Sequence, residues 1–214
     1  MGRILLQEDK KFKYEVKMSI PTLTAKQYSR SEFEVLSKEM AAWHAQVDAI
    51  EEAHYDEEFT ADERDLSDVA YTITAKMSKR LVTPEKEDLA IGALDANGKL
   101  QGLAIFSFSL SHSHKCLLHY MVTHPNNLLF QFQLKNRISG VAKIMIKAIA
   151  KFALIHLPKA EIHAQVYSYL WGSINKHFER SMMKPEGHGL ISAVLTNEKL
   201  LALCPKVDKP EAKA

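Results

Sequence analysis

The sequence predicts a single α/β domain, and three observations lead to that prediction. The chain has 214 residues, of which 46% are hydrophobic and 25% charged, as in one sizeable globular domain. Apolar segments typical of strands are interleaved with segments of helical periodicity. Asn97-Gly98 stands between two apolar runs and indicates a β-hairpin. We expect one domain over residues 1–204 and a disordered, Lys-, Glu- and Pro-rich tail over 205–214.

The first part of the chain predicts one strand and two helices. Residues 13–20 partly alternate and end at Pro21, which is typical of a short strand. Apolar residues at helical spacing predict a helix over 25–50. The acidic stretch 51–68 is expected to be a loop or a short polar helix, and a second helix is expected over 69–81.

The second part predicts a regular alternation of strands and helices. Strands are expected over 88–95, 100–109, 115–123, 161–167 and 190–195, and helices over 141–155 and 172–182. The helix over 141–155 is apolar apart from a lysine at every fourth residue, so it should be buried against the sheet with one solvated stripe. The connection 126–136 is unusually apolar for a loop, and its sequence predicts neither a helix nor a strand.

Charge is distributed unevenly along the chain. Residues 32–88 contain 16 acidic and six basic residues, whereas residues 96–160 contain no acidic residue and eight basic ones. This asymmetry indicates an anionic ligand near the middle of the chain. The alternative, that a buried sheet has little use for carboxylates, remains open. No basic run with interleaved aromatic residues occurs, so nucleic acid is not an expected partner.

Cysteine content and hydropathy indicate the compartment. The only two cysteines, Cys116 and Cys204, cannot form a disulfide framework, so a reducing, cytoplasmic location is expected. The N-terminus lacks the apolar region of a signal peptide, and no apolar run reaches the roughly 18 residues that span a membrane. The four histidines between residues 112 and 124 have no Cys pair or acidic residue nearby. We therefore predict neither a membrane partner nor a metal site.

The segment Arg137-Ile138-Ser139-Gly140-Val141-Ala142 joins an apolar run to the long apolar helix. The first N–H groups of a helix have no intrahelical partner, and the helix dipole favours an anion there. Gly140 lets the backbone approach a ligand closely, and the small Ala142 avoids crowding it. The segment therefore predicts a pyrophosphate site. Its alternative is an ordinary helix start with a packing glycine.

The order of elements, together with this Arg-x-x-Gly-x-Ala turn, resembles the GNAT family, the Gcn5-related N-acyltransferases. Their shared motif is Gln/Arg-x-x-Gly-x-Gly/Ala between the fourth strand and the following helix. The resemblance extends over roughly residues 88–183. It implies a GNAT-like mixed, mainly antiparallel sheet flanked by helices. It also implies an acyl-CoA cosubstrate, acetyl-CoA by default, with no metal.

The implied activity is N-acyl transfer to an amine of a small molecule or to a protein lysine or N-terminus. The alternative is a non-catalytic GNAT-like module that binds coenzyme A or another protein. In the family, the pantetheine arm pairs with the strand before the turn, and the turn holds the pyrophosphate. The implied cofactor-binding residues are Met121, Val122, Arg137, Ile138, Ser139, Gly140, Val141, Ala142 and Lys143.

Acyl transfer needs a proton acceptor for the amine and a proton donor for the leaving thiolate. His119 lies on the expected coenzyme strand and titrates near neutrality, and Tyr167 ends the next strand. We predict these two as the catalytic residues. The alternatives are a hydrogen-bonded strand histidine and a packed tyrosine, with Tyr169 and Ser173 as competing donors.

Two departures from the family pattern bear on function. Alignment of the last expected helix puts Phe178 where the family commonly has a tyrosine general acid, and phenylalanine cannot donate a proton. This departure favours the non-catalytic alternative. The segment 126–136 is an insertion before the turn, and its apolar residues would line an acceptor pocket or a homodimer contact.

Overall fold

The computed structural model describes residues 16–20, 23–53, 61–108, 115–128, 138–157, 159–167, 175, 178–181 and 189–205. Several sequence expectations lie wholly or mostly outside these ranges. They are the tail beyond Pro205, the insertion beyond Leu128, Arg137 of the turn, the competing donors Tyr169 and Ser173, and the expected helix over 172–182 apart from 175 and 178–181. No helix in the described ranges is long and apolar enough to cross a membrane.

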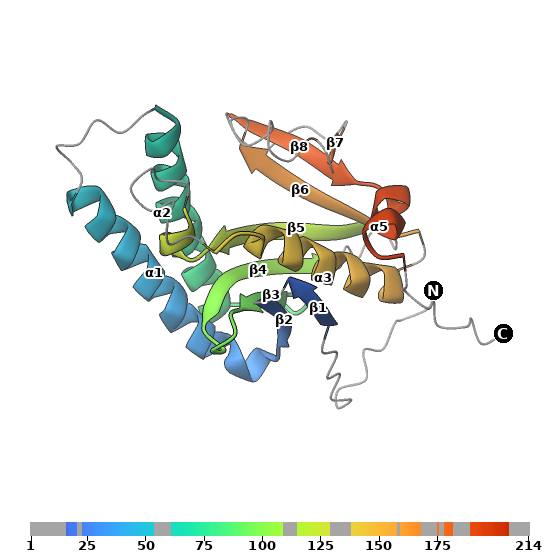
Figure 1. The fold of residues 1–214 in the computed structure, drawn as a ribbon, viewed down its shortest axis with the longest axis horizontal. Helices are drawn as coiled ribbons and strands as arrows, with labels where there is room; N and C mark the ends of the chain where they lie inside the picture. Colours follow the sequence, from blue (N-terminus) through green and yellow to red (C-terminus); the bar gives the residue numbers. More distant parts are fainter. Residues whose placement is uncertain are drawn as a thin grey trace.

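Eight strands of the described chain form one twisted sheet in the order β1-β2-β3-β4-β5-β6-β8-β7 (Figure 1). Their bounds are β1 Val16–Ile20, β2 Leu23–Tyr28, β3 Leu89–Leu94, β4 Leu100–Phe108, β5 Lys115–Thr123, β6 Glu161–Tyr167, β7 Glu179–Arg180 and β8 Leu190–Leu195. The β5–β6 pair is parallel and the other pairs are antiparallel. The expected mixed, mainly antiparallel sheet is confirmed.

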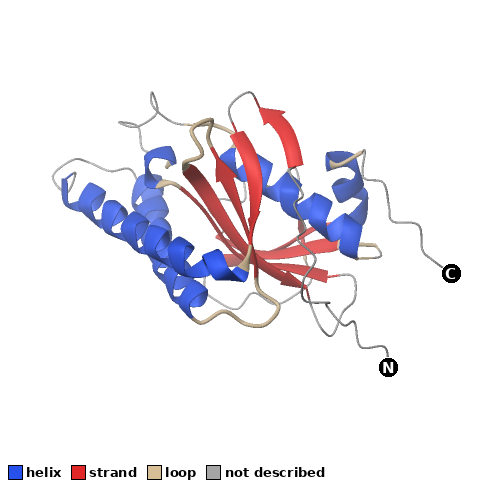
Figure 2. Cartoon of the chain, turned by 90° about the horizontal axis from the view of Figure 1, so that it is seen from below, coloured by secondary structure: helices blue, strands red, loops and turns tan. Residues whose placement is uncertain are grey.

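Helices cover both faces of this sheet (Figure 2). The hairpin of α1 (Phe33–Ala53) and α2 (Ala61–Val82) covers one face, and α3 (Val141–His156) with α5 (Asn197–Leu203) covers the other. Short 3₁₀ helices at Arg30–Glu32 and Pro125–Asn127 complete the described elements. The result is a three-layer α/β/α arrangement.

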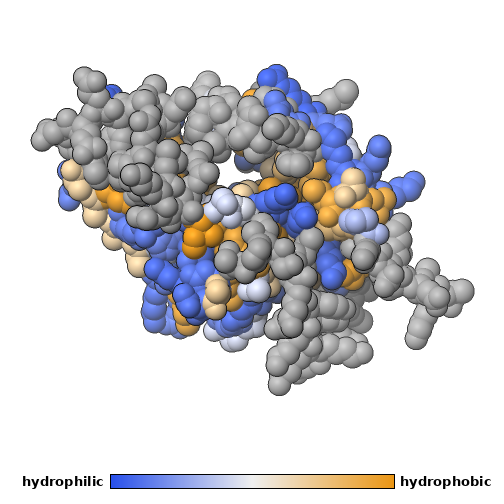
Figure 3. All heavy atoms as spheres, viewed as in Figure 1, coloured by the Kyte–Doolittle hydropathy of each residue, from blue (hydrophilic) through white to orange (hydrophobic). Residues whose placement is uncertain are grey.

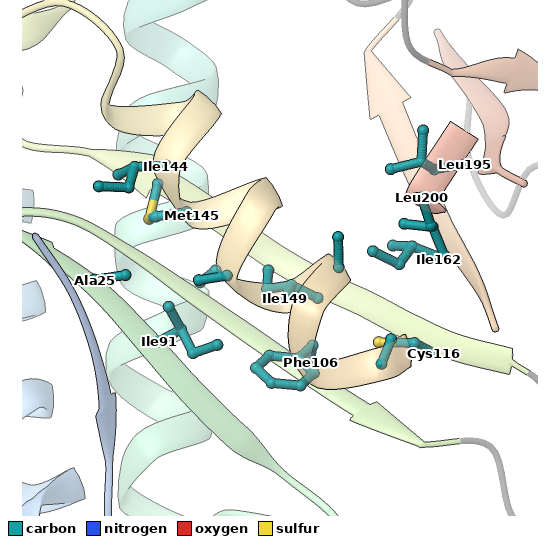
Figure 4. Close-up of a cluster of buried hydrophobic side chains, with 14 of the residues drawn as sticks. Ala25, Ile91, Phe106, Cys116, Ile144, Met145, Ile149, Ile162, Leu195 and Leu200 are labelled. Atoms are coloured by element: carbon teal, nitrogen blue, oxygen red, sulfur yellow. The ribbon is translucent and has the colours of Figure 1, made fainter. Parts of the chain in front are cut away.

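Residues of β4 alternate between the two layers of helices. Leu103 and Ile105 belong to the core under α1 and α2, whereas Ala104 and Phe106 belong to the core under α3. Figure 4 shows Ile144, Met145 and Ile149 among the labelled side chains of this second core. The helix expected over 141–155 is confirmed, and its apolar composition is explained because it packs across the middle of the sheet.

Strand predictions in the second part of the chain are confirmed closely. The predicted strands over 115–123, 161–167 and 190–195 have the same bounds in the structure. The Asn-Gly hairpin is also present, with Gly98 at φ +79° and Asp95 Oδ1 accepting the N–H groups of Asn97 and Lys99. Turn chemistry and period-two alternation are local signals, so they could be read without knowledge of the fold.

Two predictions in the first part were wrong in their boundaries. The expected helix over 25–50 begins only at Phe33, because Leu23–Tyr28 pairs with β3 as a strand. Ser29 and Glu32 form the helix-start signal, in which the Ser29 N–H donates to Glu32 Oε2 at 2.8 Å. The stretch 51–68, expected to be a loop or a short helix, belongs in large part to two long helices. Helix α1 continues to Ala53, and α2 already begins at Ala61.

The expected helix over 172–182 was also wrong wherever the structure describes that range. Asn175 is in a turn, and Glu179–Arg180 forms β7, which pairs with β8. An unpaired sheet edge offers backbone hydrogen bonds, and here that pairing overrides local helix propensity. Phe178 therefore lies just before a strand, 4% exposed in the core under α3, and not on a helix facing a ligand.

Candidate active site

The parallel strands β5 and β6 separate halfway along their length. They pair from Lys115 with Glu161 to Leu118 with Ala164, and no later pair joins them among the described residues. Past this point β5 remains paired with β4, and β6 remains paired with β8. The backbone edges that face each other across the gap are therefore not joined to another described strand, and strand edges of this kind can pair with an extended ligand.

A β-bulge at His119 explains where the strands separate. Leu118 pairs with Phe106 and Tyr120 pairs with Ile105, so the register shifts there and His119 is the one extra residue of β5 at this point of the β4–β5 ladder. A bulge bends its strand and increases the local twist. It turns the rest of β5 away from β6, at the residue after their last shared pair. The His119 Nε2 atom lies 2.8 Å from the Ser107 hydroxyl on β4.

The gap opens into a cleft of about 370 Å³. Figure 3 shows the surface hollowed above β5, where Figure 1 shows the two strands diverging. The lining comes from α2, β5, β6, β8 and the residue after β7: Ile73, Lys76, Leu117, Leu118, His119, Tyr120, His163, Ala164, Gln165, Tyr167, Ser181, Leu190, Ser192 and Ala193. The structure thus brings His119 and Tyr167, the two predicted catalytic residues, to one cleft.

Sequence reasoning missed a polar group in this cleft. The imidazole of His163 on β6 has its Nε2 atom 2.9 Å from Glu161 Oε2, and Ser192 lies on the adjacent strand β8. Period-two alternation within the predicted strand 161–167 puts Glu161, His163 and Tyr167 on one face. That alternation could have identified the group, since the strand bounds were already correct.

The first backbone N–H groups of α3 lie near the open end of β5 (Figure 1). Gly140 is the N-cap at φ +85°, a left-handed conformation that glycine adopts without strain. The first helical bond runs from the Ile144 N–H to the Gly140 carbonyl. The N–H groups of residues 141–143 therefore precede the helical ladder. Lys143 is exposed beside them, and Arg137 lies outside the described residues.

Ile138 has a different role in this turn. Its N–H donates to Asn127 Oδ1 at 2.8 Å, so this donor is engaged within the protein. Asn127 Nδ2 donates to Gln101 Oε1 at 3.0 Å, and Gln101 Nε2 donates to Asp95 Oδ2 at 2.9 Å. We call Asp95, Gln101, Asn127 and the Ile138 N–H the hairpin network. It ties the start of the α3 turn to the β3–β4 hairpin.

A glycine on β4 sets how closely α3 approaches the sheet. A Cβ atom at Gly102 would lie 2.5 Å from Val141 Cγ1 and 2.8 Å from Met145 Cε. Real Cβ atoms do not make contacts of this length, so only glycine allows the first turn of α3 to pack down here. Gly102 therefore sets how closely the first turn of α3 lies to the sheet.

Met121 and Val122 lie on the open half of β5, beyond the bulge. The Met121 side chain packs with the core under α3, and Val122 is 7% exposed in the core under α1 and α2. Both side chains are thus used for packing, which leaves the backbone as the part of these residues that faces the gap. This arrangement suits recognition of an extended ligand through backbone hydrogen bonds.

Other reactive side chains do not add to the site. Cys116 is fully buried near the start of β5, and burial raises the pKa of its thiol well above the usual range, which removes it as a nucleophile. Within the described ranges, no group of three or more His, Cys, Asp or Glu residues is arranged to hold a metal ion.

No protein-family model matches the chain, and no curated protein matches its sequence. Solved structures with a similar fold include the spermidine N-acetyltransferase from Vibrio cholerae in complex with CoA and spermine, at 11% identity and TM-score 0.47, covering 84% of this chain and 98% of that one. A chimera of that enzyme with hSSAT gives the same values. A putative GNAT-family acetyltransferase from Desulfovibrio desulfuricans is also similar, at 11% identity and TM-score 0.47, covering 82% and 99%. At this identity the similarity concerns the fold alone.

Proposed function

We propose that the protein is an acyl-CoA-dependent N-acyltransferase, with acetyl-CoA as the default cosubstrate and an amine as the acceptor. The observation that carries this proposal is the separation of β5 from β6 directly after the bulge at His119. The gap leaves unpaired strand edges beside a cleft and close to the start of a helix. A pantetheine arm carries amide groups that can pair with a strand edge, and its pyrophosphate suits a helix N-terminus.

Charge and backbone geometry at α3 support the same cosubstrate. The N–H groups of residues 141–143 converge at the start of the helix, and Lys143 adds a mobile cation beside them. Phosphate oxygens accept several hydrogen bonds at once, and bonds to ionised groups are stronger than neutral ones. In our proposal Met121 and Val122 bind the pantetheine arm through their backbones, and residues 139–143 with Arg137 bind the pyrophosphate.

In this proposal the cleft holds the thioester and the acceptor amine. Tyr167 would give a proton to the leaving thiolate, and a cleft histidine would take the proton of the amine. The sequence points to His119 for the second role, and His163 lines the same cleft. Phe178, which the sequence alignment put at the position of the family's general acid, is a core residue just before β7, so it no longer argues against catalysis.

Isothermal titration with acetyl-CoA tests this proposal at the helix N-terminus. Lys143→Glu replaces a cation by an anion beside the proposed pyrophosphate, so acetyl-CoA should bind at least about tenfold more weakly. The same change lies in the first turn of a helix, where an anion slightly stabilises the fold. Lys151→Glu makes the identical charge change about 12 Å further along the helix axis and serves as the matched control.

The two variants separate a local effect from a general charge effect. Weaker binding in Lys143→Glu with near-normal binding in Lys151→Glu is the expected result. Equal loss in both variants would assign the effect to net charge and reject the α3 site. No heat of binding from the unmodified protein with millimolar acetyl-CoA would reject the proposed function itself.

A further inference from the structure

Glu161, His163 and Ser192 form a polar group that we call the cleft cluster. All three belong to the β6–β8 strand pair, in which Gln165 lies opposite Ser192 and His163 lies opposite Val194. His163 and Ser192 are therefore diagonal neighbours on one face of the pair, and both line the cleft. The His163 side chain is 10% exposed and Ser192 is 6% exposed.

Among the residues that the structure describes, two atoms of the cleft cluster have no hydrogen-bond partner. They are His163 Nδ1 and Ser192 Oγ, and both are buried. A buried polar group left without a partner costs roughly 1–3 kcal/mol, and folded proteins pair the great majority of such groups. Two such atoms on residues that line one cleft indicate that a ligand supplies the missing partners.

Glu161 determines which kind of partner His163 requires. An ionised carboxylate only accepts hydrogen bonds, so the contact of Glu161 Oε2 with His163 Nε2 at 2.9 Å assigns the ring proton to Nε2. The Nδ1 atom of the neutral ring then carries a lone pair and needs a donor. A carboxylate that orients a histidine in this way is the arrangement of a general base.

We propose that His163 Nδ1 and Ser192 Oγ accept the two N–H groups of a neutral primary amine, and that His163 is the base that takes the proton of this amine. The inference rests on the proposed acyl transfer and deepens it by naming the class of acceptor. When both N–H groups are held, the nitrogen lone pair stays free for attack. A secondary amine has only one N–H group and leaves one of the two acceptors unpaired.

The reaction balances with residues of the cleft. The amine lone pair forms a bond to the thioester carbonyl carbon while the carbonyl π pair moves to oxygen, and His163 Nδ1 takes one N–H proton. The carbonyl then re-forms, the C–S bond breaks, and the thiolate leaves with that electron pair. The thiolate takes a proton from the Tyr167 hydroxyl, and the imidazolium restores it through water. The products are an amide and free thiol.

His163 is better suited to this role than His119. The Nε2 atom of His119 is already 2.8 Å from the Ser107 hydroxyl, on the β4 side of the bulge. His163 instead combines a fixed Nε2 atom, an unpaired Nδ1 atom and an adjacent unpaired hydroxyl. We therefore assign His163 as a catalytic residue and Glu161 as a positioning residue that acts through it.

The test measures acetyl-CoA binding and thiol release separately. Thiol release is followed with spermidine, tyramine and a lysine-containing peptide, and with the N-methylated form of each reactive amine. His163→Gln should lower kcat/KM by about 100-fold or more, the usual contribution of a general base.

Ser192→Ala should lower kcat/KM by roughly tenfold, as expected for one hydrogen bond. It should also reduce the ratio of kcat/KM for a primary amine to kcat/KM for its N-methylated form. Glu161→Gln should change the pH profile of kcat/KM, which a purely structural role would not do.

His156→Gln, near the far end of α3, is the matched control for the histidine change, and thermal melts confirm that each variant folds. Normal acetyl-CoA binding with lost turnover in His163→Gln is the expected pattern. Retained turnover in His163→Gln, equal rates with N-methylated amines, or no turnover of any amine by a wild type that binds acetyl-CoA would overturn the inference. Failure of the wild type to bind acetyl-CoA would instead reject the proposed function.

Discussion

The hairpin network and the cleft cluster are both partly buried polar groups, but they differ in how completely their atoms are paired. In the hairpin network, side-chain amides and a carboxylate link one element to the next through bonds of 2.8–3.0 Å. In the cleft cluster, one contact of 2.9 Å fixes the histidine ring, and His163 Nδ1 and Ser192 Oγ have no partner among the described residues. The first group is complete without a ligand and the second is not.

This difference distinguishes residues that hold the elements of the site in place from residues that would contact a ligand. A fully paired buried network rigidifies the elements that it joins, here the β3–β4 hairpin and the turn before α3. Unpaired buried atoms lower stability in the absence of ligand, so a protein keeps them where they have a function. Substitutions in the two groups should therefore change stability in opposite directions.

The largest effect on stability is expected in the hairpin network. Asn127→Ala removes the acceptor of the Ile138 N–H and the partner of Gln101, and it leaves a small cavity. The free energy of unfolding should fall by about 3 kcal/mol. Urea denaturation measures this change. Asn126→Ala is the control, since that side chain is exposed and its Oδ1 atom accepts a hydrogen bond from Gln46 Nε2 across the surface at 2.6 Å.

The control should cost no more than about 0.5 kcal/mol, as for most exposed positions. Equal stability of Asn127→Ala and Asn126→Ala would show that the network does not anchor the turn. The hairpin network would then contribute no measurable stability to the fold.

A smaller effect of opposite sign is expected in the cleft cluster. Ser192→Ala removes a buried hydroxyl without a partner, so the free energy of unfolding should rise by about 1 kcal/mol. Ser107→Ala is the matched change at a serine that does have a partner, His119 Nε2 at 2.8 Å, and it should lower stability by about 1 kcal/mol. Thermal and urea unfolding without ligand measure both. A loss of stability in Ser192→Ala would mean that its hydroxyl is paired after all.

The smallest effect concerns pH and His124, which lies beside the hairpin network. Burial, and secondarily the charge of Lys99, lower the pKa of His124 below its ordinary value of 6.5, while Glu39 opposes this shift. The unfolded chain therefore binds a proton more readily than the folded one. Stability should be fully present above pH 6.5 and should decrease as the pH falls from there towards the folded pKa.

The measurement compares melting temperatures between pH 7.5 and pH 5.5 for the wild type and His124→Gln. The wild type should lose more stability on acidification than the variant. Burial also lowers the pKa of His156, so His156→Gln is measured in parallel to account for that contribution. An identical pH dependence in the wild type and His124→Gln would contradict the assignment.

Much of the fold could be predicted from local sequence signals. The bounds of β5, β6 and β8 and the Asn97-Gly98 hairpin follow from alternation and turn chemistry, which depend only on neighbouring residues. β2 and β7 were missed because their strand state comes from pairing with distant strands rather than from their own residues.

The candidate site could be predicted only in part for a related reason. His119 and Tyr167 were expected and line one cleft, but the bulge that opens this cleft depends on the register between β4 and β5. His163 was on a correctly predicted strand, yet its importance depends on the absence of a partner for Nδ1. Such an absence follows from tertiary packing and has no signature in the sequence.

We propose that the open half of β5 and the start of α3 together bind the pantetheine arm and the pyrophosphate of acyl-CoA. Amide hydrogen exchange with and without acetyl-CoA is a direct test of this binding mode. Acetyl-CoA should slow exchange in peptides covering residues 119–123 and 139–143, with no change in β2 and β3. Protection confined to other segments, or an unchanged exchange pattern at saturating acetyl-CoA, would contradict it.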